Sequence, residues 1–401
     1  MDDLLYLIAK ENIQAKSELF HLREKVLRMF SIITKDMTQE DILLKWNNLG
    51  KFLDIIKQYL EKSENQISLT TIYTKKILYN LEQRQESIPI YGDTLLPVSQ
   101  NCFTKDKDAL QNIQFDIVFV QGQESHPLRT WFMSRDQEKI WPLELLSSEY
   151  SQQNPRIIFV RYDSRRLQCE HQTFNIPDHS FEDLANKLQK DLKNAGVGKR
   201  PYVIIPYSMG GIVTRTMLLQ HPEQKTNLKG VMFIGSPLIG SDMRAQINED
   251  MKGLIPILNN FMNPVDNAIS NADYNQHFLF EGLQIINSIQ QYSPLSKMTT
   301  NVDDAVNYEH HNRNFLDLNF PYKILIEDKK TMLKIIGKGY YYVPLHMGVL
   351  EPHKEDSFKV MKGKNHGNLQ QAVDKNDQTY IEVKQFIDEV LNLNSFNQQL
   401  A

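Results

Sequence analysis

The pattern of apolar positions along the chain changes near residue 90. Before that point apolar residues recur at spacings of three and four, which is the stripe of an amphipathic helix. The first stripe consists of Leu19, Leu22, Val26, Phe30 and Ile33. Similar stripes lie within residues 52–60 and 72–81. We therefore predict an all-helical N-terminal region over residues 1–92, whose apolar faces either pack within the protein or bind a partner protein.

Beyond a predicted linker over residues 93–114, the pattern changes to short apolar runs rich in β-branched and aromatic residues. These runs are residues 115–120, 156–160, 202–205, 230–234, 322–326 and 340–343. Helix-like segments such as Phe181–Leu192 separate several of them. Buried strands that alternate with helices form a mostly parallel sheet with helices on both faces. We predict this architecture for residues 115–398, with a helical insertion at about residues 243–319 that is either a lid or a structural insert.

One serine lies between a predicted strand and a predicted helix. The apolar run 202–205 is followed by Pro206, Tyr207, Ser208, Met209, Gly210 and Gly211. A strand–serine–helix turn is the geometry of a nucleophile elbow, which pushes the serine hydroxyl into the open. Gly210 and Gly211 leave room where strand and helix cross. The usual pattern is G-x-S-x-G, and Pro206 replaces its first glycine, so a purely structural serine is the alternative interpretation.

A nucleophilic serine needs a base, and the base needs a residue that orients it. In this type of fold the chain order is serine, then an acid, then histidine. Glu327 and Asp328 end the run 322–326, and His366 lies in a loop after the last predicted strand. We predict a triad of Ser208, Glu327 and His366, with Asp328 as the alternative acid. Taken singly, Glu327 is typical of a solvated turn and His366 of a surface loop.

An acyl-transfer site also needs two N–H groups that bind the developing oxyanion. One comes from the residue after the nucleophile, and the other from the loop after an early strand. The run 115–120 leads into Gln121, Gly122 and Gln123. We assign the two donors to the backbones of Met209 and Gln123; the alternative for Gly122 is an ordinary turn glycine.

Composition narrows the remaining possibilities. The 401 residues carry a net charge of −4, so no basic excess exists to bind nucleic acid. No run of about 18 apolar residues occurs, and we expect no transmembrane span, although the chain could still associate with a membrane surface. The acidic start lacks the features of a signal or transit peptide. We expect no metal and no cofactor, because no zinc-site spacing occurs among the two cysteines, the His310-His311 pair and the Cys169/His171 pair. Arg165 and Arg166 are interpreted as a surface pair.

Several longer motifs accompany the serine. They are FVQGQ and RTW within residues 119–131, IWPLELL at 140–146, RIIFVRYDSR at 156–165, AGVGKRP at 195–201, YSMGG at 207–211, GVMFIGSPLIGSD at 230–242 and KNHGNL at 364–369. With these motifs, residues 115–395 resemble the serine-active-site-containing protein family, whose members are α/β-hydrolase-fold relatives of lipases and of GPI-inositol deacylases. The resemblance implies a serine hydrolase that acts on lipid esters. It also implies a location at mitochondria or mitochondrion–ER contacts and a link to phosphatidylglycerol remodelling.

The chain departs from the family pattern around the predicted site. Gln121 replaces the histidine of the oxyanion loop, Pro206 replaces a small residue, and Leu238 replaces a histidine. The region that usually holds a Ser-Ala pair reads Leu345-His346-Met347-Gly348. Two functions are therefore carried forward. The first is an esterase or lipase; the alternative is a catalytically degraded α/β-hydrolase that serves as an accessory subunit of a larger mitochondrial membrane-associated complex, with the N-terminal helices and the insertion as contact surfaces.

Overall fold

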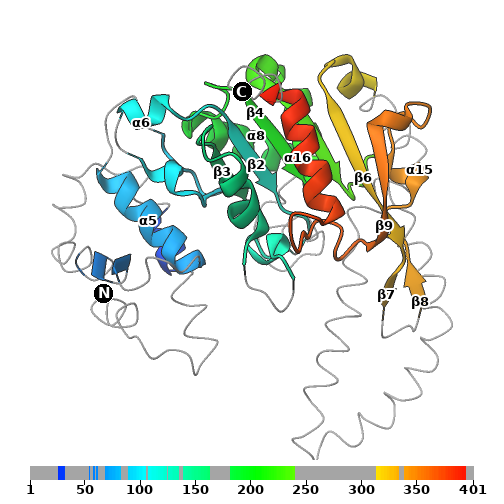
Figure 1. Cartoon of the computed structure of the whole chain (residues 1–401). Helices are drawn as coiled ribbons and strands as arrows, with labels where there is room; N and C mark the ends of the chain where they lie inside the picture. Colours follow the sequence, from blue (N-terminus) through cyan, green and yellow to red (C-terminus); the bar gives the residue numbers. More distant parts are fainter. Residues whose placement is uncertain are drawn as a thin grey trace, which may run out of the picture.

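The computed structural model describes most of the chain outside its N-terminal part and two long internal segments (Figure 1). The described residues are 26–31, 54, 57–58, 60–61, 68–82, 89–104, 107–123, 125–134, 139–162, 181–239, 313–333 and 338–393. Most of the predicted insertion at 243–319 therefore lies outside the described residues, as do Arg165, Arg166, Cys169, His171 and the His310-His311 pair.

A seven-stranded sheet forms the centre of the described structure. Its strands are β1 (Leu95–Pro97), β2 (Asp116–Val120), β3 (Arg156–Val160), β4 (Tyr202–Pro206), β5 (Leu228–Ile234), β6 (Tyr322–Lys329) and β9 (Phe358–Asn365). Their order is β1-β3-β2-β4-β5-β6-β9. All neighbours are parallel except β1, which runs antiparallel to β3.

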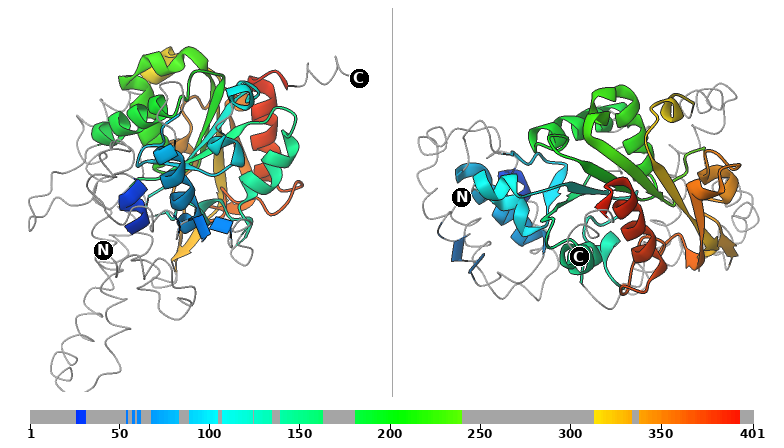
Figure 2. Two further views of the ribbon diagram at one scale, coloured as in Figure 1. Left: turned by 90° about the vertical axis from the view of Figure 1, so that its left-hand side faces the viewer. Right: turned by 45° about the horizontal axis from the view of Figure 1, so that its top comes forward.

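Helices cover both faces of this sheet. The longer ones are α5 (Leu69–Glu82), α8 (Phe181–Asn194), α9 (Gly210–Gln220) and α16 (Gln378–Val390). The shorter elements are η2 (Gln100–Phe103), α6 (Lys107–Gln111), η3 (Arg129–Trp131), η4 (Pro142–Leu146), α7 (Ser147–Glu149), η6 (Pro222–Asn227), α15 (Leu345–Gly348) and η7 (Glu355–Ser357). A separate two-stranded hairpin consists of β7 (Thr331–Leu333) and β8 (Lys338–Tyr340). Figure 2 shows α8 and α9 (green) on the opposite side of the sheet from α16 (red).

The alternation of side chains along each strand divides the core in two. In β4, Val203 and Ile205 belong to the cluster that includes residues of α16, whereas Ile204 belongs to the cluster that includes residues of α8 and α9. Both faces of the strand are therefore buried, which explains why it reads as one continuous apolar run. The strand order, the strand directions and the two helical layers confirm the predicted α/β-hydrolase fold.

The order of the strands also marks where a site belongs. From β2 the chain crosses to β3 on one side and then returns over β2 to β4 on the other. Ligands in open α/β sheets bind outside the carboxyl ends of strands at such a reversal. Here that place lies beyond Val120 and Pro206, the last residues of β2 and β4.

The structure corrects two sequence-based boundaries. The predicted linker at 93–114 contains strand β1, which extends the sheet at its edge; a three-residue strand is too short to give a pattern. The run 340–343 is not a strand of the main sheet, and the last sheet strand is β9. Strand β9 lies at the edge of the sheet, and most of its side chains are exposed or half-buried. Its sequence therefore shows no apolar run.

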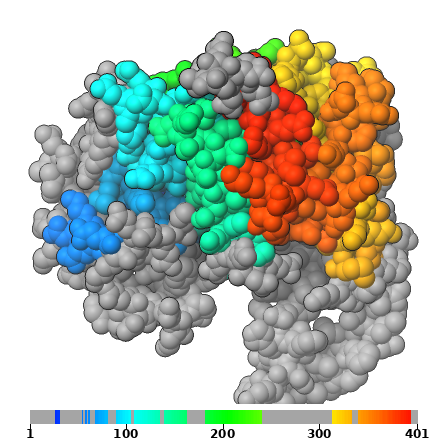
Figure 3. Space-filling view, viewed as in Figure 1, coloured from blue at the N-terminus to red at the C-terminus, as the bar shows by residue number. Residues whose placement is uncertain are grey.

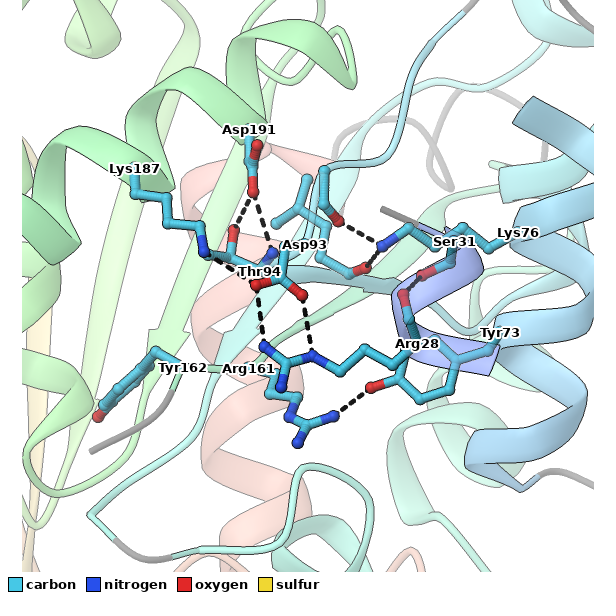
Figure 4. Close-up of polar contacts among 12 residues, drawn as sticks. Arg28, Ser31, Tyr73, Lys76, Asp93, Thr94, Arg161, Tyr162, Lys187 and Asp191 are labelled. Carbon is cyan, nitrogen blue, oxygen red and sulfur yellow. Dashed lines mark hydrogen bonds and ion pairs between the residues drawn. The ribbon is translucent and has the colours of Figure 1, made fainter. Parts of the chain in front are cut away.

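The described part of the predicted N-terminal region is helical except at Ser68 and residues 89–92. Polar contacts join it to the sheet domain (Figure 4). Arg28 donates two hydrogen bonds to the Asp93 carboxylate, at 3.0 and 2.9 Å, and Lys187 of α8 reaches the same carboxylate at 2.8 Å. The fully buried Lys76 of α5 donates to the backbone oxygens of Gly92 and Leu95. Residues 92–95 are therefore fixed in place and do not behave as a free linker.

Candidate active site

Ser208 lies in the tight turn between β4 and α9. Its φ angle is +53°, in the left-handed region that non-glycine residues rarely adopt. The turn is held by hydrogen bonds from Ser208 N to Ile234 O at 2.8 Å and from Gly211 N to Ser208 O at 3.0 Å. Such strain persists only where the surrounding structure enforces it, and it is typical of a serine presented to a substrate.

The two glycines after Ser208 are required by close packing. A Cβ atom on Gly210 would lie 2.9 Å from the Val120 carbonyl oxygen and closer still to that of Gln121. A Cβ atom on Gly211 would collide with the side chain of Ser236. Both collisions involve the neighbouring strand ends, so α9 can start this close to the sheet only with glycine at these positions.

The structure brings the three predicted triad residues together. His366 Nε2 lies 3.0 Å from Ser208 Oγ, and His366 Nδ1 lies 3.0 Å from Glu327 Oε2. A carboxylate can only accept, so Nδ1 carries the proton and Nε2 is left to accept from the serine hydroxyl. The Glu327 side chain is fully buried and that of His366 is 9% exposed, which keeps water from weakening this pair.

Of the two candidate acids, Glu327 faces the histidine and Asp328 does not. The second carboxylate oxygen of Glu327 accepts hydrogen bonds from Tyr342 N at 2.5 Å and Val343 N at 3.1 Å. Asp328 is exposed, and its carboxylate accepts from Gly363 N at 2.9 Å. The amides of residues 342 and 343, which the sequence predicted to lie in a strand, therefore orient Glu327.

Two tyrosine rings lie against the imidazole. The Tyr342 ring stacks on His366 with 4.8 Å between ring centroids and an interplanar angle of 8°. The Tyr207 ring lies at 5.2 Å with an interplanar angle of 31°, and its hydroxyl donates to His366 O at 2.8 Å. Burial, with the nearby Glu327 charge, raises the pKa of Tyr342, so this phenol stays neutral. Sequence reasoning missed both tyrosines, and the only available signal was that Tyr207 precedes the serine.

The predicted oxyanion loop lies against the serine. A Cβ atom on Gly122 would be 2.9 Å from Ser208 Cβ, so glycine is needed for this approach. The loop is fixed to the end of β3: Gln121 Nε2 donates to Tyr162 O at 2.9 Å, and Tyr162 Oη donates to Gln121 O at 2.8 Å. Within the described part of the chain, the amides of Met209 and Gln123 donate no competing hydrogen bond.

Of the other positions that depart from the family pattern, Leu238 and Gly348 are buried, whereas Leu345 and His346 are exposed. Leu238 is fully buried, and its carbonyl oxygen accepts from Arg215 Nη1 at 2.5 Å. Gly348, at the end of α15, lies against Ile326 of β6. Leu238 and Gly348 therefore contribute to packing beside the sheet.

Two kinds of feature are absent from the described residues. No group of three or more histidine, cysteine, aspartate or glutamate side chains there could hold a metal ion. No described helix is long and apolar enough to cross a membrane.

Comparison with known sequences supports the resemblance seen in the motifs. Residues 144–394 match the profile of the family described as lecithin:cholesterol acyltransferase. The bovine protein SERAC1 is 31% identical over 157 residues, which cover 33% of this chain and 23% of that protein. The zebrafish protein SERAC1 is 30% identical over 179 residues, which cover 38% and 25%. The matched region therefore spans about a quarter of these relatives.

Solved structures with a similar arrangement include esterases and lipases. A carboxylesterase of the thaumarchaeon Nitrososphaera gargenis superposes with a TM-score of 0.39 and 12% identity, covering 70% of this chain and 92% of the other. Phospholipase PlaB of Legionella pneumophila gives a TM-score of 0.41 and 10% identity, covering 71% and 63%.

Proposed function

Because this chain belongs to the lecithin:cholesterol acyltransferase family, we propose that it is a serine esterase or lipase that cleaves lipid esters through Ser208, His366 and Glu327. One observation carries the proposal. The serine Oγ, the histidine and the acid form a continuous chain of two 3.0 Å hydrogen bonds at the switch point of the sheet.

The first half of the proposed reaction forms an acyl-enzyme. Ser208 Oγ attacks the ester carbonyl carbon while His366 Nε2 takes the hydroxyl proton. The negative charge that develops on the carbonyl oxygen is bound by the amides of Met209 and Gln123. When the intermediate collapses, the C–O bond of the ester breaks, and His366 gives its proton to the departing alcohol.

The second half reverses these roles. Water, or an acceptor alcohol, gives a proton to His366 Nε2 and attacks the acyl carbon. When this second intermediate collapses, the bond between the acyl carbon and Ser208 Oγ breaks, His366 returns the proton to Oγ, and an acid or a new ester is released. Throughout, Glu327 holds the imidazole in the required tautomer and stabilises its charged form. The two tyrosine rings add a favourable interaction with the imidazolium, since aromatic faces attract cations.

The accessory-subunit alternative would be supported by a broken triad. The 3.0 Å contacts of His366 favour the enzyme, so we keep the subunit role only as an outcome of the test. The mitochondrial location implied by the resemblance also stays a prediction, which imaging of the tagged full chain would check.

The test is hydrolysis of p-nitrophenyl esters with short and long acyl chains by the full chain and by its Ser208→Ala variant. We expect turnover that the substitution abolishes, with higher kcat/KM for one range of chain lengths. No turnover of any ester by well-folded protein would contradict the proposal and favour the subunit role.

A further inference from the structure

The β7–β8 hairpin extends from the residues that form the candidate site. Its first strand follows β6 after Glu327, and its second leads directly to Tyr342, which stacks on His366 and donates to Glu327. Figure 1 shows β7 and β8 projecting beyond the sheet below β6 and β9. The hairpin is therefore attached to the rim of the site on both sides.

One face of this hairpin carries two exposed large hydrophobic side chains and a lysine. Met332 pairs across the hairpin with Gly339, and Thr331 pairs with Tyr340, so Lys330 and Tyr341 form the next row on the same face as Met332. Met332 is 60% exposed and Tyr341 is 37% exposed. Lys330 Nζ lies 5.7 Å from the centroid of the Tyr341 ring. The cation and the tyrosine lie at the base of the hairpin, and the methionine lies farther out.

The base of the hairpin carries an excess of positive charge. Lys329, Lys330 and Lys362 are exposed, and none of them forms an ion pair with a described residue. Lys329 Nζ lies 3.9 Å from the position of a Cβ on Gly363, so Lys329 lies beside this residue of β9. The carboxylate of the neighbouring Asp328 accepts a hydrogen bond from Gly363 N and offsets one of these three charges. Figure 3 shows the red C-terminal segment that includes α16 next to the orange segment before it on one face of the molecule.

We propose that this hairpin face, defined by Lys330, Met332 and Tyr341, binds an anionic phospholipid surface together with the adjacent exposed Lys329 at the end of β6. The order of side chains along the hairpin matches the layers of a membrane interface. Lysines interact with anionic head groups, tyrosine is favoured at the head-group level, and methionine enters the acyl region. Because the hairpin begins next to Glu327, binding would hold the rim of the site at the lipid surface. Binding requires no turnover, so the proposal goes beyond the esterase activity.

Vesicle sedimentation tests the proposal with the full-length Ser208→Ala protein, which cannot consume the lipid. The probes are phosphatidylcholine vesicles with and without about 30 mol % phosphatidylserine. We expect at least about tenfold stronger partitioning onto the anionic vesicles. Met332→Glu should weaken it about tenfold, and Lys329→Gln with Lys330→Gln should weaken it about thirtyfold.

Matched controls come from other exposed residues. Ile381 on α16 is 44% exposed, and Lys190 and Lys193 are exposed on α8. Ile381→Glu, and Lys190→Gln with Lys193→Gln, should leave partitioning within about twofold, since they lie outside the hairpin. Circular dichroism and thermal melting confirm that each variant is folded.

Three results would overturn the proposal. The first is equal partitioning onto both vesicle types. The second is loss of binding in the controls as large as in the hairpin variants. The third is that folded protein binds neither type of vesicle but binds polyglutamate, and that Lys329→Gln with Lys330→Gln removes this binding. That result would identify an acidic protein as the partner of this face.

Discussion

Replacement of Glu327 by glutamine removes one negative charge while nearly preserving shape. The two backbone amides of Tyr342 and Val343 hold one side-chain oxygen. In the glutamine variant these amides would keep the only remaining oxygen, so the NH₂ group would face His366 Nδ1. Nδ1 would then have to accept, and Nε2 would carry the proton. In that tautomer the histidine cannot take the proton of Ser208.

The size of the effect follows from the geometry. At the 3.0 Å separation of His366 Nδ1 and Glu327 Oε2, and an effective dielectric constant of about 20, the attraction between an imidazolium and a carboxylate is about 5.5 kcal/mol. Since about 1.4 kcal/mol changes a rate tenfold, the variant should lose about ten-thousand-fold in kcat/KM. Loss of the tautomer gives a decrease of the same order in a comparable triad.

The assay is kcat/KM for a p-nitrophenyl ester, with circular dichroism to verify folding. Asp328→Asn is the matched control, because this neighbouring carboxylate is exposed and binds only Gly363 N among the described residues. It should stay within about threefold of the unchanged protein. The reasoning would be refuted if folded Glu327→Gln kept more than about a tenth of the activity.

Three further changes probe the surroundings of the site and the attachment of the N-terminal region. Tyr342→Leu removes the ring stacked on His366 and should lower kcat about three- to tenfold, whereas Tyr342→Phe should be nearly normal; steady-state kinetics decide. Gly210→Ala places a Cβ against the Gln121 carbonyl and should give inactive or insoluble protein, so activity at wild-type solubility would contradict this packing. Asp93→Asn breaks two ion pairs and should cost about 1–3 kcal/mol in urea unfolding at pH 7. Burial of Asp93 opposes its ionisation, but Arg28 and Lys187 outweigh this effect and hold the pKa of Asp93 below its usual range. The difference in unfolding free energy between the two proteins should therefore shrink as pH falls below about 4. A difference that stays constant with pH would show that the charge of Asp93 does not cause it.

The sequence was most informative where burial was complete. Residues 156–160 and 202–206 lie in the middle of the sheet with apolar neighbours on both faces, so their pattern is unambiguous. The edge strands escaped detection, because β1 is three residues long and the apolar residues of β9 are interrupted by lysines without a regular alternation. The run 340–343 was misassigned, because aromatic and β-branched residues favour strands and nothing local shows that its amides bind a carboxylate.

The candidate site shows the same division between local and long-range information. Ser208 could be found because the strand, the turn and the helix are adjacent in sequence. The choice between Glu327 and Asp328 could not be made from sequence, since neighbouring residues point to opposite sides of a strand and the position of His366 was unknown. The ring contact between His366 and Tyr207 is made by residues far apart in the chain, and no local pattern encodes it. The same holds for the stacking of Tyr342 on His366.

The central claim is that Ser208 is an activated nucleophile, and labelling with a fluorophosphonate probe tests it most directly. We expect the probe to label Ser208, as mapped by mass spectrometry of the peptides, and we expect His366→Ala and Ser208→Ala to remove the label. Absence of label on folded wild-type protein, or label on a different residue that persists in Ser208→Ala, would contradict the account.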